Sequence, residues 1–346
     1  MKQIILVLCL LAAMTFPADA SGIVAPEVPD DVQQIMPPED RDLGQRLSYL
    51  FSEGLREAQP AVASGAKLCA RVLCALLLLT FLRQFEGASR RVVDMAGVFV
   101  LCGLLLDTTG SMIQSGAQTV EQISQYGKLL LPVMTAALAA QGGSITAASL
   151  YAATALFDAV ICGLISSVLL PMLSIILVLS AVAAASEDNM LKKLRDLLKQ
   201  LMSWTLKLVL YIFTGYISLS GIISGTADQT ALKAAKLTIS GMVPVVGGIL
   251  SDASETVLVG AAVAKNAVGI YGLLGIIAVT IVPFLVVGIN YLMLKLLSAI
   301  SPAFAPKSLT GLLQDFSTAM GFVLAMTGSV CLIQMISIMS FLRGMT

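Results

Sequence analysis

Two pairs of charged residues flank an apolar segment in the second half of the chain. Lys233 and Lys236 precede the segment, and Asp252 and Glu255 follow it. A spacing of three residues places each pair on one face of a helix. Paired carboxylates suit general acid–base chemistry, and carboxylates that face ammonium groups suit ion pairing. Because the sequence offers no partner nucleophile for these carboxylates, it favours a polar path or a docking surface over an enzyme.

The segment between the charged pairs contains residues that break helices. Pro244 removes one backbone hydrogen bond, and Gly247 and Gly248 weaken a helix further. Only about fourteen apolar residues lie between the pairs, fewer than the ~20 that a membrane-spanning helix needs. Broken backbone at membrane depth persists only where it contacts protein or water. We therefore expect a re-entrant or interfacial elbow on the outer side of a membrane.

The candidate polar path or assembly interface comprises Lys233, Lys236, Pro244, Gly247, Gly248, Asp252, Glu255 and Lys265. We predict that the two lysines pair with the two carboxylates across the elbow.

Other catalytic and metal-binding chemistry has little support. The chain has no histidine, which excludes Ser-His-Asp and Cys-His sites and imidazole ligands. Its six cysteines lie in apolar runs without C-x-x-C spacing, so we expect small buried hydrophobic residues. We predict no enzyme, no cofactor and no metal site.

The elements that carry these residues are those of a membrane protein. The 346 residues are 57% hydrophobic and 12% charged, with a mean hydropathy of +0.91. The 21 basic and 21 acidic residues cancel, so no net charge favours nucleic acid. We expect an all-α, polytopic helical membrane protein with about six to eight spans.

The beginning of the chain reads as a targeting signal followed by an outer arm. Residues 1–20 combine Lys2, an apolar run and Ala18-Asp19-Ala20, which predicts a cleaved signal peptide and an extracytoplasmic mature N-terminus. Residues 21–66 form an acidic arm whose second half has apolar residues at helical spacing. That half is expected to lie on the membrane or on a partner, or to pack on its own domain.

Residues 67–346 form the expected multi-pass domain. Spans are predicted at 68–85, 92–113, 206–223 and 267–300, with a last span ending at 342. Asp94 lies three residues after Arg91, which predicts an ion pair at the membrane interface. The apolar run 129–185 accommodates either one span with re-entrant pieces or three spans. A basic amphipathic helix over 186–204 is expected on the cytoplasmic face.

Two parts of the membrane domain resemble each other in order and spacing. KLLLPVMTAALAAQGG, an apolar run with Pro171 and LRDLLKQLMSWT match KLTISGMVPVVGG, an apolar run with Pro283 and LTGLLQDFSTAM. We predict a parallel internal repeat, 128–224 and 236–342, with a second, weaker elbow at 128–143. Parallel repeats occur in transporters, so the pattern favours a permease or a pore.

The stretch TGYISLSGIISGTADQTALKAAK followed by VPVVGG-x-LSDA-x-ET resembles the stage III sporulation protein AE family of endospore-forming bacteria. The signal, the acidic arm and the polytopic remainder are also similar to that family. The resemblance implies a multi-pass membrane subunit on the mother-cell side of a transenvelope channel or export complex, needed for late forespore gene activation. The alternative is a stand-alone secondary permease for a small solute.

The same resemblance implies the partners of the chain. They would be other stage III sporulation membrane proteins, including a secretion-type ATPase and ring-forming subunits, and a forespore-side partner. Membrane lipid is expected around the protein, and nucleic acid is not.

Overall fold

The computed structural model describes residues 26, 28–38, 42–84, 90–140, 144–186, 188–219 and 267–344. Within these ranges every regular element is helical. The elements are α2 (Asp30–Gln33), α3 (Leu43–Leu82), α4 (Arg90–Ala140), α5 (Ser144–Leu164), the π-helical turn η2 (Ile165–Leu169), α6 (Leu170–Ser186), α7 (Asn189–Leu219), α10 (Ala267–Ile300), the 3-10 turn η3 (Ser301–Ala303) and α11 (Lys307–Gly344). The predicted all-α class is confirmed for this part of the chain.

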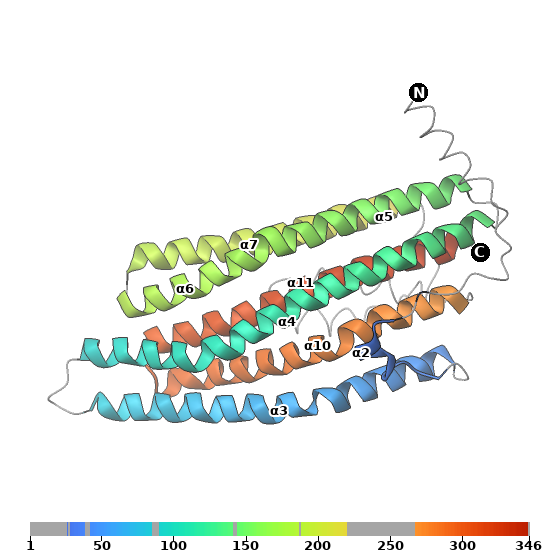
Figure 1. Ribbon diagram of the computed structural model, residues 1–346. Helices are drawn as coiled ribbons and strands as arrows, with labels where there is room; N and C mark the ends of the chain where they lie inside the picture. Colours follow the sequence, from blue (N-terminus) through green and yellow to red (C-terminus); the bar gives the residue numbers. More distant parts are fainter. Residues whose placement is uncertain are drawn as a thin grey trace, which may run out of the picture.

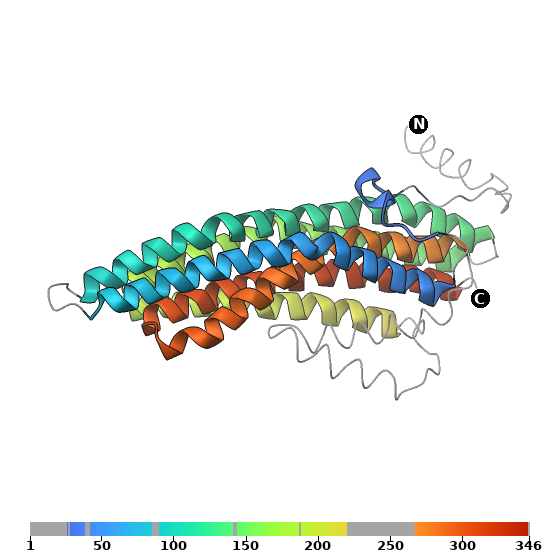
Figure 2. The same ribbon diagram turned by 90° about the horizontal axis from the view of Figure 1, so that it is seen from below.

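The long helices lie side by side in an elongated bundle (Figures 1 and 2). Helices α3, α6 and α10 end, and α4, α7 and α11 begin, at the same end of the bundle, on the left in Figure 1, which we call the turn end. Five helical stretches are long and apolar enough to cross a membrane: 43–82, 91–139, 150–186, 269–303 and 307–342. A multi-pass membrane protein is therefore confirmed, and five of the expected spans have candidates among the described residues.

The acidic arm leads directly into the first membrane helix. Residues 43–66 and the predicted span that follows form the single 40-residue helix α3. The first half of α3 packs against α10, where Gly54 lies next to Ile281. Of the expected placements for this amphipathic half, the structure shows packing on its own domain.

Helix α7 also unites two predicted elements. The amphipathic stretch 186–204 was expected as a separate surface helix before a span, but residues 189–204 and the span belong to one 31-residue helix that packs upright on α6 and α11. The reason is a continuous buried face, because Met202, Leu206, Leu210 and Phe213 follow one another at helical spacing and are all buried.

The prediction of a weaker elbow at 128–143 is wrong for residues 128–140, which include Pro132. Helix α4 runs through this proline without interruption to Ala140. The Pro132 side chain is exposed, so its ring meets no neighbouring helix, and the cost is one missing backbone bond. Residues 141–143 lie outside the described part. The apolar run 129–185 therefore comprises the end of α4 and one rod, α5–η2–α6, over Ser144–Ser186.

Helix α11 is the central element of the bundle. It contacts α4, α5, α6, α7 and α10, and almost every residue from Leu312 to Leu342 is buried. Most of its buried hydroxyls bond within the helix: Ser337 Oγ donates to the Ile333 carbonyl at 2.8 Å, and Ser340 Oγ to the Ile336 carbonyl at 2.9 Å. Ser317 Oγ is an exception, since it is buried without a partner among the described residues. Hydroxyls satisfied in this way do not oppose burial in an apolar bundle.

Close contacts through glycine bring α10 against α4. A Cβ on Gly275 would lie 2.4 Å from the Tyr126 Oη, and one on Gly272 would lie 2.6 Å from Leu130 Cδ2. Small residues permit this approach, which is how helices gain packing energy in a membrane, where lipid already solvates apolar side chains. The pair of contacts holds α4 and α10 in one register.

Candidate functional site

The eight predicted site residues, Lys233, Lys236, Pro244, Gly247, Gly248, Asp252, Glu255 and Lys265, lie outside the described residues. Their roles stay predictions. Two polar clusters among the described residues lie between helices.

The first cluster, which we call the Asp158 junction, joins α4, α5 and α11. Ser124 Oγ of α4 donates to Asp158 Oδ2 at 2.8 Å, and Gln334 Nε2 of α11 donates to Asp158 Oδ1 at 2.5 Å. Cys162 Sγ, one turn along α5, donates to Asp158 Oδ1 at 3.6 Å. Ser124, Asp158 and Gln334 are each at most 2% exposed. One carboxylate thus accepts bonds from three donors on three helices.

A glycine makes room for this junction. Gly127 lies on α4 one turn after Ser124, and a Cβ there would lie 2.6 Å from Gln334 Nε2 and 2.8 Å from its Oε1. Any side chain at this position would push the amide of Gln334 out of place. Gly127 is therefore a positioning residue for the bond between Gln334 and Asp158.

Ionisable residues within membrane helices are rare and mark functional or structural junctions. Asp158 is the single charged residue in the run 129–185. Its neighbours in the junction are a hydroxyl, an amide and a thiol, and each donates its hydrogen bond to the carboxylate. The geometry supports a fastening of three helices at the centre of the bundle.

The second cluster, which we call the Asp315 ion pairs, joins α7 to α11. Arg195 Nη1 lies 2.6 Å from Asp315 Oδ2, and Lys199 Nζ pairs with Asp315 Oδ1. The Asp315 side chain is 5% exposed, and the two cationic side chains are 16% and 18% exposed. Arg195 also bonds Asp196. Two cations around one carboxylate hold the charged first turns of α7 against the central helix.

A further ion pair lies at the turn end. Asp94 Oδ2 pairs with Arg83 Nη2 at 2.5 Å, across the connection between α3 and α4. The sequence predicted Arg91 as the partner, and that residue is exposed. A partner on the neighbouring helix replaces the one within the helix because Asp94 faces α3 and is half-buried there. Thr80 Oγ1 fastens the same end by donating to the Phe304 carbonyl at 2.9 Å.

The described cysteines are free thiols in several environments. Cys102 is buried, whereas Cys69, Cys162 and Cys331 are half-buried, in reasonable agreement with small hydrophobic residues in a core. Cys74 differs, since it is exposed on the surface of α3.

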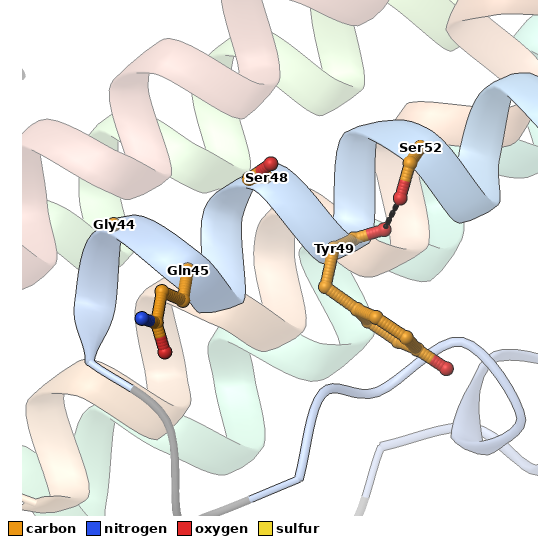
Figure 3. Close-up of a pocket in the computed structure, with 5 residues that line it drawn as sticks. All are labelled: Gly44, Gln45, Ser48, Tyr49 and Ser52. Atoms are coloured by element: carbon orange, nitrogen blue, oxygen red, sulfur yellow. Dashed lines mark hydrogen bonds between the residues drawn. The ribbon is translucent and has the colours of Figure 1, made fainter.

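A shallow surface pocket of about 430 Å³ lies along the first turns of α3. Gly44, Gln45, Ser48, Tyr49 and Ser52 line it, and Figure 3 shows the Tyr49 ring directed towards the segment that contains α2. Ser52 Oγ donates to the Tyr49 carbonyl at 2.9 Å. The lining carries no charged group, so the pocket offers little chemical basis for selecting a ligand.

Sequence reasoning missed the partners in both clusters. Asp158 was visible as a lone charge in an apolar run, and Gln334 is the only amide between Gly321 and Leu342. Their isolation was the available signal, because an amide or a carboxylate in a membrane helix needs a partner on another helix. Their separation of 176 residues gave no sign that they meet.

Five apolar helical stretches, one of them the central helix α11, are joined by buried polar clusters and define a polytopic α-helical membrane protein. The family model for stage III sporulation protein AE matches residues 35–343. The chain belongs to this family. It is similar to the stage III sporulation protein AE of Bacillus subtilis (strain 168), at 26% identity over 237 residues, which cover 68% of this chain and 59% of that relative. No solved structure matches the chain. Family membership assigns a membrane role in sporulation.

Proposed function

We propose that this protein is a multi-pass membrane subunit of the mother-cell and forespore transenvelope channel or export complex that late forespore gene activation requires. The observation that carries the proposal is the family match over residues 35–343, which spans the bundle and the residues for which the elbow is predicted. The protein is not an enzyme under this proposal, and it needs no cofactor.

The core of the bundle favours a subunit over a stand-alone permease. Phe316, Phe322 and Phe341 of the central helix α11 are each at most 1% exposed and fill the space between the surrounding helices. A permease that works alone encloses its solute path near the middle of its own fold. A centre filled with aromatic side chains leaves a path at the surface or between subunits.

The distribution of basic residues supports a topology. The turn end carries Arg83, Arg90, Arg91, Lys192, Lys193 and Lys307. Basic residues near the ends of membrane helices remain on the cytoplasmic side. The turn end is then cytoplasmic, and the mature N-terminus and the elbow are extracytoplasmic, after cleavage of a signal over residues 1–20. The protein resides in the mother-cell membrane around the forespore.

The internal repeat remains part of the proposal. Helices α6–α7 and α10–α11 both form hairpins that turn at the same end, and α7 and α11 start there and lie against each other. That arrangement agrees with a parallel duplication over 128–224 and 236–342. Under this duplication the re-entrant elbow around Pro244 is the first part of the second repeat, on the outer side.

Reconstitution separates the two candidate functions. The full chain, purified alone in lipid vesicles, is expected to move no small solute, and it should co-purify from sporulating cells with a secretion-type ATPase, ring-forming subunits and a forespore-side partner. Solute transport by the single chain would overturn the proposal and support a secondary permease.

Charge reversal tests the elbow as an assembly interface. Reversing Asp252 and Glu255 to lysine should reduce co-purification with the partners, and reversing Lys233 and Lys236 to glutamate in the same chain should restore it. Failure of the second reversal to restore assembly counts against the pairing. Accessibility of single cysteines over 225–266 to a water-soluble maleimide then distinguishes a water-lined path, with periodic labelling, from a protein-covered face.

A further inference from the structure

Helix α7 has an exposed apolar face with an unusual spacing. Met190, Leu194, Leu197, Leu201, Trp204 and Leu208 follow one another at alternating intervals of four and three residues. Each is between 39% and 76% exposed, and the same step continues to Tyr211 at 60%. We call this set the α7 seam. The mean interval of 3.5 residues over three heptads is the spacing that two packed helices bury between them.

The opposite face of α7 is already occupied. Arg195 and Lys199 pair with Asp315 of α11, and Met202, Leu206 and Leu210 are buried. Figure 1 shows α7 along the outer edge of the bundle beside α6. The seam therefore points away from the bundle, and nothing in the described part of the chain covers it.

Lipid alone does not account for the seam. Lys193, Asp196 and Gln200 are exposed beside its first half, and hydrocarbon rejects such groups. A helix surface that faces lipid does not need its apolar residues confined to two positions in every seven. A surface that packs on another helix does need this pattern.

We propose that the α7 seam is the contact between two copies of this chain, packed through parallel α7 helices in register. Copies in one membrane share one orientation, so their α7 helices run in the same direction. In such a pair Lys193 of one copy lies beside Leu198 of the other, and Gln200 beside Thr205, so no like charges face each other. The lysine stem covers the leucine while its ammonium group stays in water.

The area of the seam matches a stable pair. Seven large side chains that are about half exposed present roughly 700 Å², taking about 200 Å² for a full side chain. Standard interfaces bury ~800 Å² from each partner. The Asp315 ion pairs stiffen the helix from behind, which lowers the entropy that the pair must give up on contact.

Disulfide trapping tests this contact in native membranes. The native cysteines are replaced first, and the background is used only if its unfolding matches that of the parent. Leu197→Cys and Trp204→Cys, at 58% and 60% exposure, should form a linked dimer under mild oxidant. Val178→Cys on α6, at 60% exposure, is the matched control and should give on the order of tenfold less, since its sulfur atoms do not meet the geometry of a disulfide.

Equal linkage at Leu197→Cys and Val178→Cys would overturn the proposal. Equal linkage is the result expected if lipid or the segment 220–266 covers the seam. Linkage of Leu197→Cys to a different polypeptide would also overturn it. A second measurement uses two tagged copies that carry substitutions of Leu197. Co-purification should fall about tenfold when both copies carry Leu197→Lys, and it should recover when one carries Leu197→Lys and the other Leu197→Glu. Absence of recovery contradicts direct self-contact.

Discussion

Replacing Gly127 by alanine tests whether the Asp158 junction fastens the bundle. The new Cβ would lie 2.6 Å from Gln334 Nε2, well inside contact distance, so the flexible amide must swing away and release Asp158. Alanine in a helix interior gains about 0.5–1 kcal/mol over glycine. Two losses oppose this gain in stability. The lost interhelical bond costs ~0.6 to 1.7 kcal/mol in membrane proteins, and the buried group that is left unsatisfied costs about 1–3 kcal/mol.

The matched control is Gly110→Ala on the same helix. Nothing lies within 4 Å of a Cβ at that position, so the substitution should raise the free energy of unfolding through helix propensity alone. We expect the two variants to differ by about 2 kcal/mol, with Gly127→Ala the less stable. Unfolding of the purified protein in mixed micelles by sodium dodecyl sulfate, followed by circular dichroism, measures both.

Coupling to Gln334 sharpens the test. If Gly127→Ala acts by displacing the amide, adding Gln334→Ala should cost little more, because the bond to Asp158 is already lost. Equal stabilisation by Gly127→Ala and Gly110→Ala, or fully additive losses in the double variant, would refute the reasoning.

Three further substitutions test other fastenings of the fold by the same unfolding assay. Asp315→Asn should lower the free energy of unfolding by about 2–3 kcal/mol, slightly less than for a fully buried pair, because its cationic partners reach water. Asp196→Asn, whose side chain is 60% exposed, should change it by less than ~0.5 kcal/mol. Thr80→Val should cost about 1 kcal/mol through the lost bond to the α10–α11 connection, whereas Thr318→Val, with its exposed hydroxyl, should be close to neutral. Pro132→Ala should stabilise the continuous helix α4 by up to ~3 kcal/mol, because alanine restores the missing backbone donor; destabilisation would contradict this reasoning.

Helix content and membrane character could be predicted because both are local properties. Apolar runs long enough to span a bilayer identify themselves without knowledge of their neighbours, and five of them have helices in the structure. Family resemblance was also local, since it rested on the VPVVGG-x-LSDA-x-ET stretch and the family model then covered 35–343.

Helix boundaries were harder, for a physical reason. The predicted break between the amphipathic stretch 186–204 and the next span followed a change in polarity on the outer face of α7. Continuity depends on the inner face, where Met202, Leu206 and Leu210 pack without interruption. Where a helix passes from one environment to another, the polarity of its exposed residues changes, whereas its buried residues stay apolar.

Partners across the bundle could not be predicted at all. Asp94 had Arg91 within its own helix, and the sequence offered no means to rank Arg83, eleven residues away on another helix. Asp158 and Gln334 are further apart still. In a soluble protein the apolar face of each helix indicates what it faces, but a lipid-facing surface is as apolar as a buried one. Register between helices is then set by glycines such as Gly127 and Gly275, whose role appears only in contact.

Helix α11 shows most directly why hydropathy does not locate the centre of this fold. Its mean hydropathy is lower than that of α10 or of the rod α5–η2–α6, yet 89% of its most apolar window is buried, against 50% and 39%. Hydropathy measures transfer into lipid, whereas the central position selects residues that other helices can approach and that satisfy themselves. Ser329, Ser337 and Ser340 bond to their own helix, and Asp315 and Gln334 bond to α7 and α5. A helix surrounded by protein can carry these groups because other helices, and not lipid, lie against them. Hydropathy by itself does not mark this position, since α3 and α4, at 1.9 and 1.8, are lower still and only 28% and 33% buried.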